Sequence, residues 1–138
     1  MLDNAAKAMY VQKHEGLSLK PYICTAGKVS IGIGRNLDDR GISKEEAYML
    51  FNNDCLNTDR DLISVFGNDY YSFPDKAQLV FFDMMFQLGL TRFCGFKKTI
   101  EYAKAGNWKE AARELMDSKY AEQVPKRAEE NRALLFSI

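Results

Sequence analysis

The first residue whose type and position suggest chemistry is Glu15, which we expect at the end of an N-terminal helix. Gly16 follows it directly and marks the end of that helix. A carboxylate at the junction between a helix and a hairpin can lie at the base of a cleft. Partial burial there raises its pKa and makes it a general acid. Position alone is weak evidence, because most glutamates near helix ends are surface residues.

A second candidate is the glycine-rich segment 22–37, YICTAGKVSIGIGRNL, which we expect to form a hairpin of two or three strands. A turn around residues 25–27 places Cys24 near Ser30, on the hairpin that faces Glu15. Gly32 and Gly34 allow a tight bend or the close approach of a ligand. A dinucleotide site is disfavoured, because the third glycine and the following helix of that motif are missing.

Composition excludes several other classes of protein. The chain has 138 residues, 46% hydrophobic and 28% charged, which predicts a single globular domain over residues 1–138. Lys plus Arg and Asp plus Glu each total 19, and this balance argues against a nucleic-acid binder. With 3 Cys, 1 His and no C-x-x-C, we expect no disulfide framework, no metal and no cofactor.

The charge balance is uneven along the chain. Residues 1–90 hold 9 basic and 12 acidic side chains, and residues 91–138 hold 10 basic and 7 acidic ones. One interpretation is chance placement on solvated helix faces. The other is a mildly basic C-terminal surface that can approach an anionic polymer.

The elements expected around these residues are mostly helices. Asp3 is a good N-cap for a helix over 3–15, and the loop 38–41 closes a hairpin lobe over about 17–41. Ser43 and Glu46 form a capping box that opens a helix into the low 60s. Further helices begin at Phe73-Pro74, Asn107 and Val124-Pro125.

The helix after Pro74 is apolar nearly all round, which is typical of the buried centre of a helical domain, and Gly89 is its expected end. Cys55 and Cys94 are expected as core thiols, and Trp108 as a packing residue. The N-terminus lacks a continuous apolar core, and the apolar stretch 79–90 is interrupted. We therefore expect synthesis in the cytoplasm and no stable membrane association.

Several blocks of the sequence resemble, in matched order and spacing, the phage T4-type lysozymes, the endolysin muramidases of glycoside hydrolase family 24. The blocks read EGLSLKPY from Glu15, SIGIG from Ser30, FQLG from Phe86, NWKEAA from Asn107 and QVPKRA from Gln123. The resemblance implies an α+β, mainly helical, lysozyme-like fold. It has a small hairpin lobe, a helical body over about 43–138, and an active-site cleft between them.

The activity implied by the resemblance is hydrolysis of the β-1,4 bond between N-acetylmuramic acid and N-acetylglucosamine in bacterial peptidoglycan. An endolysin of a phage or prophage is made in the host cytoplasm. It acts on the cell wall in the periplasm after holin-dependent release. We expect a monomer.

The resemblance also assigns catalytic residues. The catalytic glutamate of the family falls on Glu15, and its threonine falls on Ser30, which keeps the hydroxyl. Its aspartate falls on Cys24, which is the main departure from the family pattern. The family's histidine after the second glycine is Arg35 here, so we expect His14 to be a surface or helix-terminal residue.

The remaining assignments lie in the helical body. Phe86 and Gln87 fall where the family lines its sugar-binding cleft, and Thr99 occupies a small polar position there. The resemblance places Arg127 beside Glu15 as an ion-pair partner that orients the carboxylate.

Several roles of Cys24 in the second half of the reaction are compatible with the sequence. A glycosidase needs one group that protonates the leaving oxygen and another that activates water or attacks the sugar. Cys24 could act as a thiolate base, hold the water together with Ser30, or attack to form a thioglycoside. It could also be a small buried residue in a degenerate site.

Two rival functions follow from the same residue. Without the second carboxylate, the chain could be a catalytically impaired lysozyme homologue that binds peptidoglycan without cutting it. A cysteine peptidase or amidase using Cys24 and His14 is a weaker alternative, because no third orienting group is evident.

Overall fold

A computed structural model describes all residues, 1–138. The chain is 71% helical with a small three-stranded antiparallel sheet near its N-terminus. This confirms the expected α+β, mainly helical, class. By its internal contacts the chain divides into two compact units, which we call the hairpin unit (Met1–Met49) and the helical unit (Leu50–Ile138).

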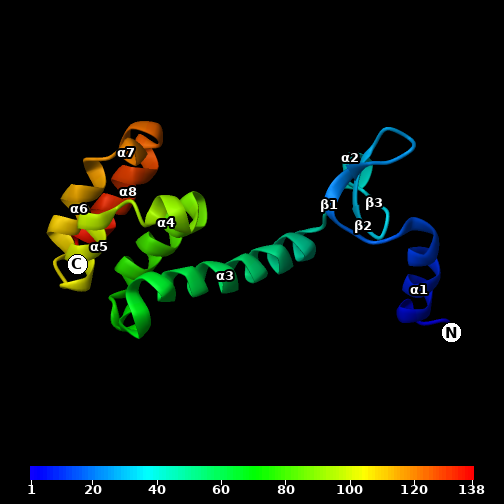
Figure 1. The fold of residues 1–138 in the computed structure, drawn as a ribbon, viewed down its shortest axis with the longest axis horizontal. Coiled ribbons are helices and arrows are strands. Elements are labelled where there is room, and N and C mark those ends of the chain that lie inside the picture. Colours follow the sequence, from blue (N-terminus) through cyan, green and yellow to red (C-terminus); the bar gives the residue numbers. More distant parts are fainter. The chain divides into compact units, whose positions relative to one another are not determined.

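Helices and strands follow one another with short connections (Figure 1). In chain order they are α1 (Asn4–Glu15), β1 (Ser18–Ile23), β2 (Val29–Gly32), β3 (Arg35–Asn36), α2 (Leu37–Arg40), α3 (Lys44–Phe66), the 3-10 helix η1 (Gly67–Ser72), α4 (Asp75–Phe93), α5 (Lys97–Lys104), α6 (Trp108–Met116), α7 (Lys119–Gln123) and α8 (Pro125–Phe136).

The first helix begins and ends where its local signals predict. The Asp3 side chain accepts a hydrogen bond of 2.8 Å from the Ala6 amide, which satisfies one free N–H group of the first turn. Gly16 ends the helix with a φ of 75°. His14 lies exposed in the last turn, and its ring contacts Tyr10 edge-on at 5.0 Å, as expected for a helix-terminal residue.

The predicted hairpin is present, with strand order β1-β2-β3. Tyr22 pairs with Ser30 in the β1–β2 ladder, and Ser30 pairs in turn with Asn36 on β3. At the hairpin turn the Cys24 amide donates to the Lys28 carbonyl at 2.9 Å, and the Gly27 amide donates to the Cys24 carbonyl at 2.9 Å. Ser30 therefore lies on the central strand, flanked on both sides.

The segment after the sheet differs from prediction in one respect. Residues expected as a loop form the short helix α2, because the Asn36 side chain accepts from the Asp39 amide and caps it. The capping box that opens α3 is confirmed. The Glu46 amide donates to Ser43 Oγ at 3.1 Å, and the Ser43 amide donates to Glu46 Oε1 at 2.9 Å.

The apolar core lies in the helical unit. Its largest fully buried side chains come from α3, α4, α6 and α8, and include Leu62, Phe81, Phe93, Leu115 and Leu135. Aromatic rings pack around Phe66, which contacts Phe81 at 5.1 Å and Phe93 at 6.0 Å between ring centroids. The core thus joins helices that are far apart in sequence.

Helix α4 is the expected central helix, with two corrections. Its helical backbone breaks at Gly89, as predicted, and a short helical segment continues to Phe93. The helix is not buried all round, because Leu79 and Phe86 are 59% and 43% exposed. Its other apolar side chains supply much of the core.

The structure confirms some of the smaller predictions in the helical unit and contradicts others. Cys94 is exposed, so the prediction of a core thiol was wrong there, and Cys55 is only half-buried. Helix α6 begins after Asn107, whose side chain makes no capping hydrogen bond. Trp108 packs edge-on against Phe73 at 5.0 Å, as a packing residue should.

A helix that crosses a membrane must be long and apolar enough to span it. No single helix meets that requirement. Helices α4 and α5 meet it only when taken together, and they are bent by 119° at the break between them.

Candidate functional site

Glu15 packs against the glycine turn between β2 and β3. A Cβ atom placed on Gly34 would lie 3.0 Å from Glu15 Oε2, 3.1 Å from its Cγ and 3.2 Å from its Cδ. The hairpin unit therefore brings the end of α1 onto this turn, as the sequence predicts for a carboxylate at a helix–hairpin junction. The Glu15 side chain is exposed, so it lacks the partial burial expected from the sequence.

Cys24 and Ser30 are brought together by the hairpin. Cys24 lies one residue beyond β1, and Ser30 lies on β2, where it is 3% exposed. The Ser30 hydroxyl is close enough to the Cys24 thiol to help lower its pKa. Ser30 pairs with Tyr22 in the ladder, two residues before Cys24, so the hairpin places the thiol and the hydroxyl diagonally across the two strands.

The environment of Cys24 favours the thiolate. Hydrogen bonds from the backbone N–H groups of Lys28 and Ala26 lower the pKa of the thiol, and the Ser30 hydroxyl adds to this. Partial burial opposes the shift but is outweighed. The Lys28 ammonium group pairs with Asp39 at 3.2 Å and is not among the causes of this shift.

An ion pair of Arg35, directly after Gly34, was not predicted from the sequence. Arg35 Nη1 donates to Glu46 Oε1 at 2.9 Å and to the Gly41 carbonyl at 3.1 Å. The Arg35 guanidinium lowers the pKa of Glu46 to about 2. The contact ties β3 to the first turn of α3, and the capping box had already marked Glu46 as a structural acid.

In the helical unit, Arg127 is held by a polar network that the sequence did not predict. Its guanidinium donates to both carboxylate oxygens of Asp83, at 2.8 and 2.5 Å. Asn131 donates to the same carboxylate at 3.0 Å and also contacts the Tyr120 hydroxyl at 2.8 Å. The Arg127 contact is the main reason that the pKa of Asp83 is lowered.

Phe86 and Gln87 offer groups suited to a sugar. Phe86 is 43% exposed and belongs to an aromatic cluster with Phe82, at 6.0 Å, and Phe51, at 5.6 Å. Gln87 Oε1 is buried and has no hydrogen-bond partner in the chain. Buried polar atoms are nearly always paired, so this unpaired amide oxygen is an exception within the helical unit.

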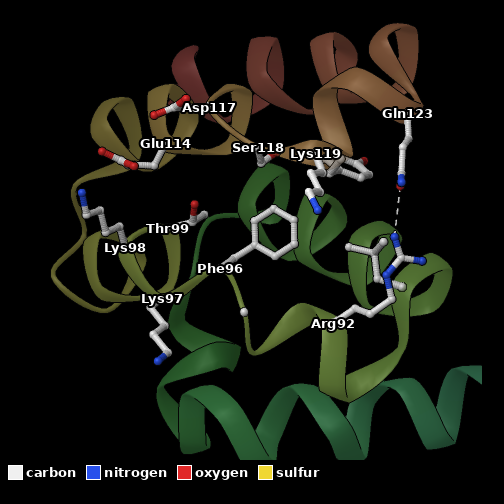
Figure 2. A pocket seen from close by; sticks show the side chains of 13 residues that line it. Arg92, Phe96, Lys97, Lys98, Thr99, Glu114, Asp117, Ser118, Lys119 and Gln123 are labelled. Carbon is white, nitrogen blue, oxygen red and sulfur yellow. Dashed lines mark hydrogen bonds between the residues drawn. The ribbon is translucent and has the colours of Figure 1, made fainter.

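Thr99 lines a pocket of about 630 Å³ within the helical unit. Figure 2 shows its side chain at the start of α5, below α6, with Phe96 beside it. The Thr99 side chain is 2% exposed. Charged residues surround the opening, four basic and two acidic: Arg92, Lys97, Lys98, Lys119, Glu114 and Asp117.

The structure thus describes two groups of predicted site residues. Glu15, Cys24 and Ser30 belong to the hairpin unit, where the same small sheet positions them. Phe86, Gln87, Thr99 and Arg127 belong to the helical unit. The first group carries an acid, a thiol and a hydroxyl, and the second carries an exposed aromatic ring and an amide.

Comparisons with known proteins place this chain in a family. The model of the phage lysozyme family matches residues 12–132. The chain is 27% identical to probable T4-type lysozyme 2 of Dictyostelium discoideum, over 83% of this chain and 84% of that protein. It is 26% identical to the pre-baseplate central spike protein Gp5 of Enterobacteria phage T4, over 91% of this chain and 26% of that much longer protein. The chain therefore belongs to the phage lysozyme family of muramidase-type peptidoglycan hydrolases.

Proposed function

We propose that this protein is a phage or prophage endolysin. It hydrolyses the β-1,4 bond between N-acetylmuramic acid and N-acetylglucosamine in peptidoglycan, with Glu15 as the general acid. The observation that carries the proposal is the placement of the exposed Glu15 carboxylate against the Gly34 turn, in the same unit as the Cys24 thiol and the Ser30 hydroxyl.

In this mechanism Glu15 donates its proton to the glycosidic oxygen as the bond from that oxygen to the anomeric carbon breaks. A water molecule supplies the oxygen that bonds to the anomeric carbon. Cys24 and Ser30 position this water, and the water's proton passes to the thiolate or to solvent. The hydrogen bonds that lower the pKa of Cys24 enlarge its thiolate fraction, which supports a role as base.

Substrate binding is assigned to the helical unit. The exposed ring of Phe86 is suited to stack on a sugar face, and Gln87 Oε1 is suited to accept the N–H of an N-acetyl group. Thr99 offers a hydroxyl in its pocket. Arg127 is proposed as a residue that supports the site, with Asp83 holding its guanidinium in place.

The biological setting follows from the family and remains part of the proposal. The enzyme acts as a monomer on bacterial peptidoglycan in the periplasm, after holin-dependent release from the host cytoplasm. It needs no cofactor and binds no nucleic acid. The excess of basic side chains in residues 91–138 suits an approach to an anionic cell wall.

Digestion of purified peptidoglycan tests the reaction. We expect new reducing ends in the soluble products and no new amino groups. A peptidoglycan-binding homologue without activity would sediment with the cell wall and release neither. New amino groups without reducing ends would show peptide cleavage and overturn the proposal.

A substitution at Cys24 separates the possible roles of the thiol. Cys24→Asp restores the carboxylate of the family pattern and should keep activity if the residue manages water. Cys55→Ser is the matched control, because it removes a thiol outside the proposed site. Complete loss in Cys24→Asp alone would instead assign a thiol-specific step, such as a thioglycoside intermediate.

A further inference from the structure

We propose that Gly34 is a positioning residue, whose missing side chain lets the Glu15 carboxylate occupy its place on the sheet. The inference rests on the proposed function of Glu15 as general acid. It adds a residue whose contribution comes through Glu15, because Gly34 itself has no group that can react.

The contact is specific to the acidic end of Glu15. The three atoms nearest to a Cβ on Gly34 are Oε2, Cγ and Cδ of Glu15, at 3.0, 3.1 and 3.2 Å. All three distances are shorter than an ordinary van der Waals contact between such atoms. No other side chain and no backbone atom is as near, so an added methyl group would displace the Glu15 side chain itself.

Both backbones in this contact are held independently. Glu15 ends α1, where the Gly16 amide donates to the Gln12 carbonyl at 2.7 Å. Gly34 precedes Arg35, which pairs with Ile31 across the sheet and is braced by Glu46. The distance between the Gly34 and Glu15 backbones is therefore set by the fold of this unit.

A displaced acid loses catalytic power, because proton transfer requires the donor within hydrogen-bond distance of the leaving oxygen. Misplacement of a reacting group by about 1 Å can cost about 100-fold in rate. A methyl group on Gly34 requires a smaller shift, of several tenths of an ångström. We therefore expect a loss of about tenfold in kcat.

The chain supplies a matched control in the same turn. Gly32 has a φ of 71° and Gly34 a φ of 74°, so alanine is strained to a similar degree at either position. A Cβ on Gly32, however, meets nothing within 4 Å. The two alanine variants thus share the backbone cost and differ in the Glu15 contact.

The test compares initial rates of reducing-end release by Gly34→Ala and Gly32→Ala on soluble peptidoglycan fragments. We expect similar decreases in Tm, and a kcat at least tenfold lower in Gly34→Ala than in Gly32→Ala, with little difference in KM. The side chain of Glu15→Asp is shorter and vacates the space that a methyl group on Gly34 would fill. Adding Gly34→Ala to Glu15→Asp should therefore lower kcat by a smaller factor than adding Gly34→Ala to the wild-type protein. Equal kcat values in the two glycine variants would overturn the proposal.

An NMR measurement on the unmodified protein tests the contact without activity. We expect a nuclear Overhauser effect between the Gly34 Hα and the Glu15 Hγ protons. Its absence overturns the role of Gly34 even if the enzyme is active, or if Gly34→Ala does not fold. If the contact is observed but the protein releases no reducing ends, the proposed function fails and the positioning role falls with it.

Discussion

The hairpin unit and the helical unit are stabilised in different ways. All sixteen buried apolar residues lie in the helical unit, and none lies in the hairpin unit. The hairpin unit is instead held by backbone ladders, helix caps and ion pairs, such as Arg35 with Glu46 and Lys28 with Asp39. The proposed catalytic residues belong to the unit without an apolar core.

This difference indicates that the helical unit supplies stability and that the hairpin unit supplies the proposed catalytic groups. Hydrophobic burial is the largest stabilising contribution to folding, so the helical unit carries most of the stability. The hairpin unit can then use glycines and exposed polar groups, which contribute little stability but leave room around Glu15 and Cys24. Substitutions in the two units should therefore affect different measurements.

The largest effect on stability is expected from Phe81→Ala. Phe81 is fully buried at the centre of the aromatic core, and its truncation leaves a cavity that should cost about 3–5 kcal/mol. Urea unfolding measures the loss. The folded fraction should keep its kcat, and a large drop in kcat with unchanged stability would remove the contrast between the units.

A smaller loss is expected from Asp83→Ala, which leaves Arg127 without its partner. We expect the free energy of unfolding to fall by about 1–2 kcal/mol. The loss is kept this small because solvent screens the pair, whose Arg127 and Asp83 side chains are 41% and 31% exposed. Because the pKa of Asp83 is lowered in the folded state, its contribution is present above about pH 4 and is lost as the pH falls through the folded pKa. In urea unfolding, the free energy of unfolding should decrease less between pH 6 and pH 3 in the variant than in the wild-type protein. An identical pH profile would contradict this assignment.

Within the hairpin unit, Ser43→Ala removes the capping box that opens α3. The expected cost is about 1 kcal/mol, because the Glu46 amide loses its side-chain acceptor. Thermal unfolding followed by circular dichroism provides the measurement. Lys44→Ala is a control at the next position, where no cap is removed. Equal effects of the two changes would show that the cap does not contribute.

The smallest predicted effect concerns the reactivity of Cys24. Ser30→Ala removes the hydroxyl that helps to lower the thiol pKa, while the two backbone N–H groups remain. Alkylation of Cys24 by iodoacetamide at pH 7 should slow by about two- to fivefold, since a full pKa unit changes the thiolate fraction about tenfold. Peptide mass spectrometry gives the rate, with Cys94 as the internal reference. A faster reaction in the variant would contradict this role of the hydroxyl.

Local signals predicted much of the fold. Asp3, Gly16 and the pair Ser43 and Glu46 act through contacts within a few residues, and each marks the helix end expected of it. The hairpin register likewise followed from the turn around residues 25–27. Asn36 was missed because its capping role depends on the amide of Asp39, in a segment rich in turn residues.

Contacts between distant residues could not be predicted in this way. Asp83 and Arg127 are 44 positions apart, and nothing in either local sequence marks the other as a partner. Cys94 looks like a core residue by type, yet it lies exposed just after α4 ends at Phe93. The contact of Glu15 with Gly34 depends on the whole hairpin unit, although the glycine had been noted as a point of close approach.

The central claim is that the hairpin unit supplies the acid, and Glu15→Gln tests it most directly. The substitution keeps the size of the side chain and removes the proton donor. The measurement is the initial rate of reducing-end release from purified peptidoglycan, with Tm measured on the same samples. We predict a loss of about 100- to 10,000-fold, the usual contribution of a general acid, at an unchanged Tm. A variant that released reducing ends at the wild-type rate would contradict the account.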